Sequence, residues 1–392
     1  MMKFCWLGLF FLSSVLSVAQ KPAPSSTVSG RVFCSDTNAP ARMAMVMLEP
    51  AETAGRQPSK AIYSQAVRTL LDGSFSIPHV APGMYYLIAS APGYVSPLAA
   101  LGVSPEDLVK QDDSLKQKIN SMVPHVIVQA NLPASIDVTL ERGAAVSGTV
   151  LYDDGSPATG LDVSLLVRRK DKWVPIPSGP FDSFRHTETD DRGTYRISGL
   201  PAQEYLVAVT LRLDKVTYEF GNGGTGMSMS AGFSLPVYSG GAWRTKDATP
   251  FSVKLGEERH GEDVQIAISR LHTVRGTLTA AHDGHVVNGG SIQLLHADDK
   301  SEAAKVDLTK DDNGFLFQFI PDGDYILHVV NASDTEYEEI PNPPGTVPPS
   351  RIKSQVVRSY GPVDEPLHVD RDIIGLAVSV PDLAPGKVPG NQ

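Results

Sequence analysis

The sequence is poor in cysteine, which limits how the folded chain can be stabilised. Only two of the 392 residues are cysteines, and Cys5 lies in an apolar run at the N-terminus. Once that run is removed, Cys34 stands alone and no intramolecular disulfide can form. We expect Cys34 to be a small, half-buried core residue. Stability must then come from packed apolar cores, and a chain of this length is long enough for several.

The chain also lacks a cluster of positive charge. Its formal net charge is -10, and the densest basic run, residues 168–172, is interrupted by Asp171. We interpret this run as a solvated hairpin. An acidic balance without a basic stripe argues against nucleic acid or an anionic membrane surface as a partner.

Long apolar runs are missing except for a short one at the N-terminus. Lys3 precedes an apolar run over residues 4–18, and Ser17-Val18-Ala19 forms a small-x-small cleavage pattern. This arrangement predicts a secretory signal peptide over residues 1–20, with an uncleaved anchor as the alternative. No later stretch approaches about 18 apolar residues, so we expect no membrane insertion after signal cleavage. The predicted location is the periplasm, the cell surface or the medium.

Motifs for common catalytic chemistries are missing too. The sequence contains no H-E-x-x-H, G-x-S-x-G, P-loop or G-x-G-x-x-G pattern. His282-Asp283-Gly284-His285 is a close histidine pair that could hold a metal with a distant third ligand, but a solvated turn is the preferred interpretation. Adjacent aspartates such as Asp190-Asp191 are interpreted as turns rather than calcium sites. We therefore predict no catalytic residues, no metal and no cofactor.

What the sequence does contain is one unit present three times. A strand with an internal glycine, an acidic turn and a proline turn before a tyrosine strand recur in the same order. The strand glycine precedes the turn glycine by 43, 45 and 38 residues, and the turn glycine precedes the tyrosine by 12, 12 and 11. This agreement indicates one fold repeated three times. The markers are Gly30, Gly73 and Tyr85, then Gly148, Gly193 and Tyr205, then Gly276, Gly314 and Tyr325.

Apolar residues alternate within each unit, which predicts strands with one buried face. Each unit closes on a further alternating run, at residues 136–140, 264–268 and 374–378. Short strands separated by Gly, Pro and Asp turns predict antiparallel β-sandwiches. A helical signal is confined to residues 105–122, with Ser104 as a candidate N-cap.

We therefore predict an all-β chain of three tandem sandwich domains, at residues 27–142, 143–271 and 272–381, with a disordered tail at 382–392. Each domain carries one long insertion before its closing strand. Loops this long are often functional. The insertions cover residues 96–133, 214–262 and 334–372.

The V-S-G-x-V strand around Gly30 and Gly148, the T-D-x-x-G-x-[YF] turn and the L-P-x-G-x-Y turn resemble the carboxypeptidase regulatory-like domain. The segment ending in Gly93 and Tyr94 is also similar to that family. The second copy departs from the pattern, since Gln203 precedes Glu204 where the motif has its glycine. The resemblance implies a seven-stranded, transthyretin-like (prealbumin-like) sandwich, grouped with carbohydrate-binding-like folds and found as an accessory module. It implies no peptidase activity.

The second insertion holds the candidate binding residues, which are Tyr218, Phe220, Phe233 and Trp243. Exposed rings between glycines suit stacking on sugars or docking of a protein, although the same rings could fold back over the sandwich. We predict a secreted, non-catalytic accessory or adhesion-type protein that binds a glycan or an envelope protein. A scaffold subunit of a cell-envelope complex is the alternative, and an enzyme using the insertions is a third interpretation.

Overall fold

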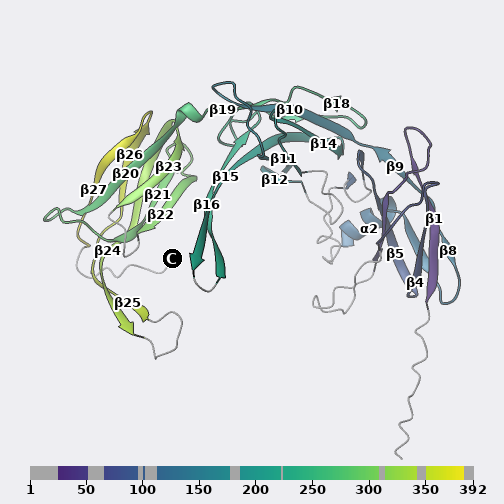
Figure 1. The fold of residues 1–392 in the computed structure, drawn as a ribbon, viewed down its shortest axis with the longest axis horizontal. Helices are drawn as coiled ribbons and strands as arrows, with labels where there is room; N and C mark the ends of the chain where they lie inside the picture. The colour runs from purple at the N-terminus through teal and green to yellow at the C-terminus, as the bar shows by residue number, and fades with distance from the viewer. Residues whose placement is uncertain are drawn as a thin grey trace, which may run out of the picture.

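The computed structural model describes residues 25–51, 66–95, 100–101, 113–176, 186–221, 224–308, 314–341 and 350–383. The described chain is an all-β protein whose strands form several sheets, with short helical segments that include α2 (Asp113–Met122) and the 3-10 helix η3 (Ile268–Arg270). No helix in these described ranges is long and apolar enough to cross a membrane. The predicted signal peptide lies outside the described residues. Figure 1 shows the strands gathered in three lobes along an arch.

The first unit packs two sheets face to face, in the strand orders β4-β1-β9-β6 and β3-β2-β5-β7. Val28, Ile77 and Leu87 are fully buried between them, and Cys34 is buried rather than half-buried. Helix α2 adds Ile119 to a small cluster beside this core. The strands are β1 (Ser26–Cys34), β2 (Met45–Pro50), β3 (Ala66–Arg68), β4 (Ser74–Val80), β5 (Gly83–Ser90), β6 (Tyr94–Val95), β7 (His125–Val128), β8 (Ala134–Ser135) and β9 (Val138–Arg142).

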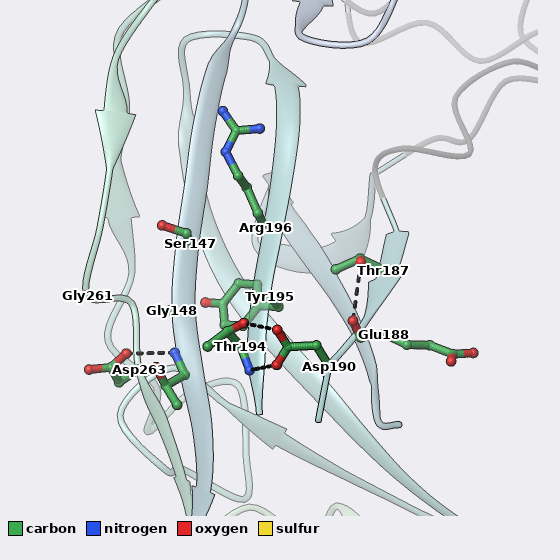
Figure 2. A pocket seen from close by; sticks show the side chains of 11 residues that line it. Ser147, Gly148, Thr187, Glu188, Asp190, Thr194, Tyr195, Arg196, Gly261 and Asp263 are labelled. Carbon is green, nitrogen blue, oxygen red and sulfur yellow. Dashed lines mark hydrogen bonds between the residues drawn. The ribbon is translucent and has the colours of Figure 1, made fainter. Parts of the chain in front are cut away.

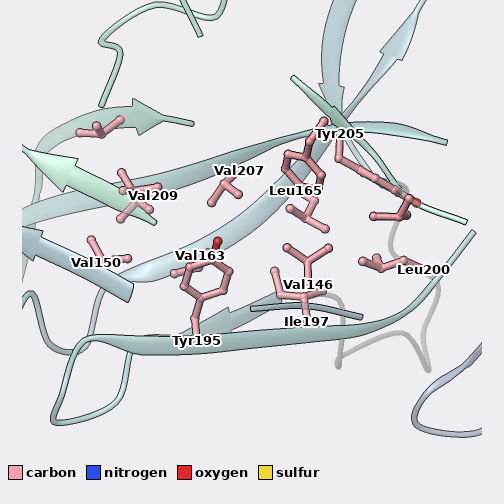
Figure 3. Packing of buried hydrophobic residues seen from close by; sticks show 14 of the residues in the cluster. Val146, Val150, Val163, Leu165, Tyr195, Ile197, Leu200, Tyr205, Val207 and Val209 are labelled. Atoms are coloured by element: carbon pink, nitrogen blue, oxygen red, sulfur yellow. The ribbon is translucent and has the colours of Figure 1, made fainter. Parts of the chain in front are cut away.

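The second unit repeats this arrangement, with β14-β10-β18 in one sheet and β12-β11-β15-β16 in the other. Its core is formed by apolar side chains that the two sheets direct toward each other, including Val146, Leu165 and Ile197 (Figure 3). The strands are β10 (Ala144–Tyr152), β11 (Asp162–Arg169), β12 (Lys172–Pro175), β13 (His186–Glu188), β14 (Thr194–Leu200), β15 (Glu204–Gly221), β16 (Gly224–Tyr238), β17 (Phe251–Ser252), β18 (Glu258–Arg259) and β19 (Val264–Ile266).

The third unit has sheets in the orders β23-β20-β27 and β22-β21-β24-β25 around a separate core. The chain thus has three cores with matching strand arrangements, while the exact domain boundaries stay a prediction. The strands are β20 (Leu271–Ala280), β21 (Gly289–His296), β22 (Glu302–Leu308), β23 (Phe315–Pro321), β24 (Gly323–Pro341), β25 (Ser350–Ser359), β26 (Val363–Val369) and β27 (Ile373–Val380).

The repeated strand glycine is explained by what lies beside it. Gly148 pairs with Tyr195 on the neighbouring strand, and a Cβ at Gly148 would lie 2.2 Å from the carbonyl oxygen of Glu262. Gly30 pairs with Phe75 and Gly276 with Phe315 in the same way. Each glycine therefore makes room for a buried aromatic ring and for the closing segment of its own unit.

In each unit the sheet that holds the glycine strand is mixed, whereas the sequence predicted antiparallel sandwiches. Strand β1 runs parallel to β8 and β9, β10 runs parallel to β18 and β19, and β20 runs parallel to β27. In each unit the glycine strand and the closing strand are the first and the last, and the second sheet lies between them in sequence. No hairpin joins them, so no tight turn imposes an antiparallel direction.

Two of the predicted long loops are largely extended hairpins. Strand β15 pairs with β16 from Ala208–Tyr238 out to Gly221–Gly224, and β24 pairs with β25 from Ser333–Ser359 out to Pro341–Ser350. The sequence interpretation took the glycines of the second insertion as signs of a flexible loop. Instead Gly221 and Gly224 form the last pair of the hairpin, where turn residues belong.

Two residues expected to be buried in closing strands are exposed. Ile268 lies in η3 at the end of the second unit and is 43% exposed. Ile374 is 66% exposed because the register of β27 shifts at this point, where Gly375 adopts a φ of 80°. A bulge reverses the alternation, so Ile374 faces outward while Val378 is buried. The helix predicted over 105–122 is described only from Asp113 onward, since residues 102–112 lie outside the described ranges. Of the predicted tail, Asp382 forms an isolated bridge with Tyr360.

The three tyrosines are structural, as their strand positions indicated. Each hydroxyl donates to the carbonyl oxygen four residues upstream: Tyr85 to Ala81 at 3.0 Å, Tyr205 to Pro201 at 2.9 Å and Tyr325 to Pro321 at 2.8 Å. Tyr205 and Tyr325 are buried, and Tyr85 is half-buried. The same hydrogen bond from a tyrosine hydroxyl to a backbone carbonyl therefore recurs near the start of β5, β15 and β24.

Candidate functional site

The predicted binding residues divide into two groups. Tyr218 and Phe220 lie in β15 and Phe233 lies in β16, but their side chains lie outside what the structure describes. Trp243 follows β16 and is half-buried against the second core. The structure therefore describes the surroundings of Trp243 alone among the four.

Other rings of the same insertion fold back onto their own unit. Phe251 is 6% exposed and lies 6.3 Å from the ring of Tyr205, centroid to centroid. Tyr238 packs against the small cluster that contains Leu206, and burial raises the pKa of its hydroxyl. For these two residues, the alternative that the rings cover the sandwich is the one observed.

Trp243 lines a groove between the second and third units, here called the joint groove. Two adjoining pockets of about 680 and 420 Å³ form it. Both pockets are lined by Trp243 and Arg244 from the second unit and by His296, Pro321 and Tyr325 from the third. Tyr238 and Phe319 add aromatic surface to the smaller pocket. The groove thus places rings from two units around one space.

A cluster of ion pairs bridges the two units at this groove. Arg244 Nη1 donates to both carboxylate oxygens of Asp298 at 3.0 Å, and its Nη2 donates to Asp299 and, at 3.2 Å, to Ser301 Oγ. Lys246 contacts Asp298 and Asp299 as well. Hydrogen bonds from Lys246 and then Arg244 hold the pKa of Asp298 below its usual value.

The third unit contributes the rings of His296 and Tyr325 to the groove, and Tyr325 belongs to the third core. The rings of His296 and Tyr325 lie 5.2 Å apart between centroids, and burial raises the pKa of Tyr325 to about 12. Burial, followed by the charge of Arg244, lowers the pKa of His296. His296 is therefore neutral at neutral pH.

A second set of contacts ties the connection between the same two units. Ser269 donates its backbone N–H to Asp153 at 3.0 Å, and Arg270 Nε donates to Asp322 at 2.7 Å. His272 Nε2 lies 2.5 Å from the other oxygen of Asp322. Of these contacts the Arg270–Asp322 bond crosses between the units, so the connection joins them in addition to the ion-pair cluster.

A pocket of about 610 Å³ in the second unit has polar walls, but the fold uses their hydrogen-bonding groups (Figure 2). Asp190 accepts hydrogen bonds from the backbone N–H groups of Arg192 and Thr194, at 2.9 and 2.7 Å. The bonds from Thr194 lower the pKa of Asp190. Asp263 accepts the N–H of Thr149 at 2.7 Å. The acidic turn of the second unit is therefore a structural element, as the sequence indicated.

No pattern in the sequence indicates the joint groove as a whole. Arg244 and Asp298 are 54 positions apart and belong to different units, and each alone is a common surface residue. Tyr325 belongs to the core of the third unit and also lines the groove.

The comparisons with known proteins found similarity among solved structures alone. No family model and no curated protein matches the chain. It is similar to a streptococcal ancillary pilin, at 12% identity and a TM-score of 0.31, over 92% of this chain and 99% of that one. It is also similar to GBS52, the minor pilin of Streptococcus agalactiae, at 11% identity and a TM-score of 0.27, over 64% of this chain and 100% of that one.

A third similar structure is the TIE protein of Bacillus anthracis, at 12% identity and a TM-score of 0.20, over 91% of this chain. The chain spans about half of that protein, 51% of its length. At these identities and scores, no activity or partner is transferred from these proteins.

Proposed function

We propose that this chain is a secreted, non-catalytic accessory protein built from three transthyretin-like sandwiches, and that it binds a glycan in the joint groove. The observation that carries the proposal is the position of Trp243. Its ring lines a space of several hundred Å³ together with rings from the next unit. The predicted signal peptide supports secretion, and the motif resemblance supports an accessory role.

The chemistry of the groove favours a sugar over a flat protein surface. Aromatic faces stack on the C–H faces of pyranose rings, and carboxylates accept hydrogen bonds from sugar hydroxyls. Asp322 and Asp324 line the larger pocket beside Trp243 and Tyr325. Each carboxylate has about four acceptor positions, so it can accept a sugar hydroxyl in addition to its bonds within the protein.

The second candidate function is a stiff scaffold of a cell-envelope complex. One observation favours it: Arg244 directs its two terminal nitrogens at three side chains of the third unit and is only 18% exposed. An arginine held in this way fixes the angle between units rather than recognising a ligand. In this case Trp243 is part of a joint, and no glycan binds.

A glycan array with the mature protein, followed by titration calorimetry on the strongest glycan, tests the proposal. Trp243→Ala is expected to lose at least tenfold in affinity, because stacking on a tryptophan is a central contribution in such sites. Trp173→Ala is the matched control, since Trp173 is also half-buried in the second unit and does not line the groove.

The two candidates predict different results for Arg244→Ala. If a glycan binds in the groove, Arg244→Ala is expected to lower its affinity, because the two walls of the groove are no longer held together. A pure scaffold predicts a change of shape in small-angle scattering with no saturable glycan binding by any variant. Binding that survives Trp243→Ala unchanged would place the ligand elsewhere and refute the proposal.

A further inference from the structure

The third unit brings together two histidines and three carboxylates from three separate segments. His282, Asp283 and His285 lie on the turn between β20 and β21, Asp334 lies in β24, and Asp382 lies beyond β27. Potential ligand atoms of His282, Asp283 and His285 lie within 4.8 Å of one another. The glycine inside this pair favours a solvated turn, and neither Asp334 nor Asp382 is near the pair in the chain.

In each of the two histidines, the two ring nitrogens face two different carboxylates. His282 Nε2 lies 3.2 Å from Asp283, and His285 Nδ1 lies 2.5 Å from the other oxygen of the same carboxylate. The opposite nitrogens face different carboxylates: His285 Nε2 lies 3.1 Å from Asp334, and His282 Nδ1 lies 3.3 Å from Asp382. Each ring therefore has one nitrogen toward the shared Asp283 and one toward an outer carboxylate.

This is the arrangement that metal-binding histidines adopt. A carboxylate that accepts the N–H of one ring nitrogen fixes the tautomer and leaves the lone pair of the other nitrogen for the metal. Asp334 is itself held, because the buried Tyr360 donates its hydroxyl to Asp334 at 2.6 Å. Imidazole nitrogens with one carboxylate suit zinc and related divalent ions, with a fourth position open to solvent.

A cationic group already lies against this cluster. Arg358 Nη1 lies 2.6 Å from His282 Nε2. The guanidinium can only donate, so that nitrogen carries a lone pair directed at a positive charge. Arg358 is exposed, so it can leave when an ion binds. We propose that His282, Asp283 and His285 form a binding site for a divalent transition-metal ion such as Zn²⁺, with Asp334 and Asp382 orienting the histidines and Arg358 displaced on binding.

Calorimetric titration of Zn²⁺ into the tag-free, chelator-treated full chain tests this, with Co²⁺ absorption in the visible range as a second readout. We expect one saturable site and a Co²⁺ spectrum of a four-coordinate ion. His282→Ala and His285→Ala are each expected to lower the affinity at least 100-fold. Asp334→Asn is expected to lower it about 10- to 100-fold, the range for an orienting carboxylate. Arg358→Ala is expected to raise it, because a competing cation is removed.

The matched control is His328→Ala, which removes another histidine of the third unit that pairs with a single aspartate, Asp364. It is expected to leave Zn²⁺ affinity unchanged. The proposal is overturned if the wild-type chain shows no saturable Zn²⁺ binding, or if His282→Ala and His285→Ala bind as tightly as wild type while their melting temperatures are normal. A decrease in affinity for Arg358→Ala would contradict the assigned role of Arg358.

Discussion

Replacing Tyr205 separates a structural from a binding role for the repeated tyrosine. The ring is fully buried, its hydroxyl donates to Pro201 at 2.9 Å, and it accepts from Gln203 Nε2 at 2.9 Å. Tyr205→Ala removes a buried ring at the start of β15 and should cost roughly 3–5 kcal/mol. Tyr205→Phe keeps the ring and loses the hydrogen bonds, which should cost about 1–2 kcal/mol.

Tryptophan fluorescence measures this in the second unit alone. Trp173 and Trp243 both belong to that unit, and Trp6 lies in the predicted signal peptide. At about 4 °C per kcal/mol, Tyr205→Ala should lower the fluorescence midpoint by roughly 12–20 °C and Tyr205→Phe by roughly 4–8 °C. Tyr85→Ala, at the half-buried equivalent in the first unit, should leave the fluorescence midpoint unchanged. If Tyr205→Ala kept its midpoint but lost glycan binding, the core assignment would be wrong.

Two more predictions concern the repeat and the joint. Gly148→Ala should destabilise the second unit by roughly 1–3 kcal/mol in urea unfolding, because the added Cβ would lie 2.2 Å from the backbone oxygen of Glu262. The control Ser147→Ala should change the free energy of unfolding by less than about 0.5 kcal/mol. The pKa of Asp298 is lower in the folded chain than in an unfolded one, chiefly because Lys246 and Arg244 donate hydrogen bonds to it, so these contacts stabilise the joint at neutral pH and are lost as the pH falls below about 4. Small-angle scattering should show a larger maximum dimension at acid pH than at pH 7. Arg244→Ala should show this larger dimension already at pH 7. Identical scattering curves for the wild type at both pH values and for Arg244→Ala would contradict a joint held by the ion-pair cluster.

The sequence predicted the local structure of each unit well, because the repeat supplies three independent instances of one pattern. Gly30, Gly148 and Gly276 lie on the predicted strands, and the alternation after Tyr325 matches its buried face. The start of β15 differs, because Leu206 and Ala208 on its other face are buried as well. The alternation of apolar residues indicates which face of a strand is buried. A tight turn indicates that two strands are antiparallel only where that turn joins them. The parallel pairing of β10 with β19 could not be predicted, since no turn connects them.

Features that depend on distant segments were missed for a related reason. The exposure of Ile374 depends on a bulge at Gly375, and a glycine alone does not distinguish a bulge from an ordinary strand position. The contact of Arg244 with Asp298 depends on how two units meet, and the contact of His285 with Asp334 depends on a hairpin that was expected to be a loop. Spacing along the chain contains none of this information.

The most direct test of glycan binding at the joint groove is fluorine NMR of the mature chain labelled with 5-fluorotryptophan. The mature chain has two such residues, Trp173 and Trp243, so the spectrum should contain two resonances. Trp243→Phe assigns them. On titration with the strongest glycan from the array, the Trp243 resonance should shift and saturate while that of Trp173 stays in place. If saturating glycan left the Trp243 resonance unmoved, or moved only that of Trp173, the groove would not be the binding site.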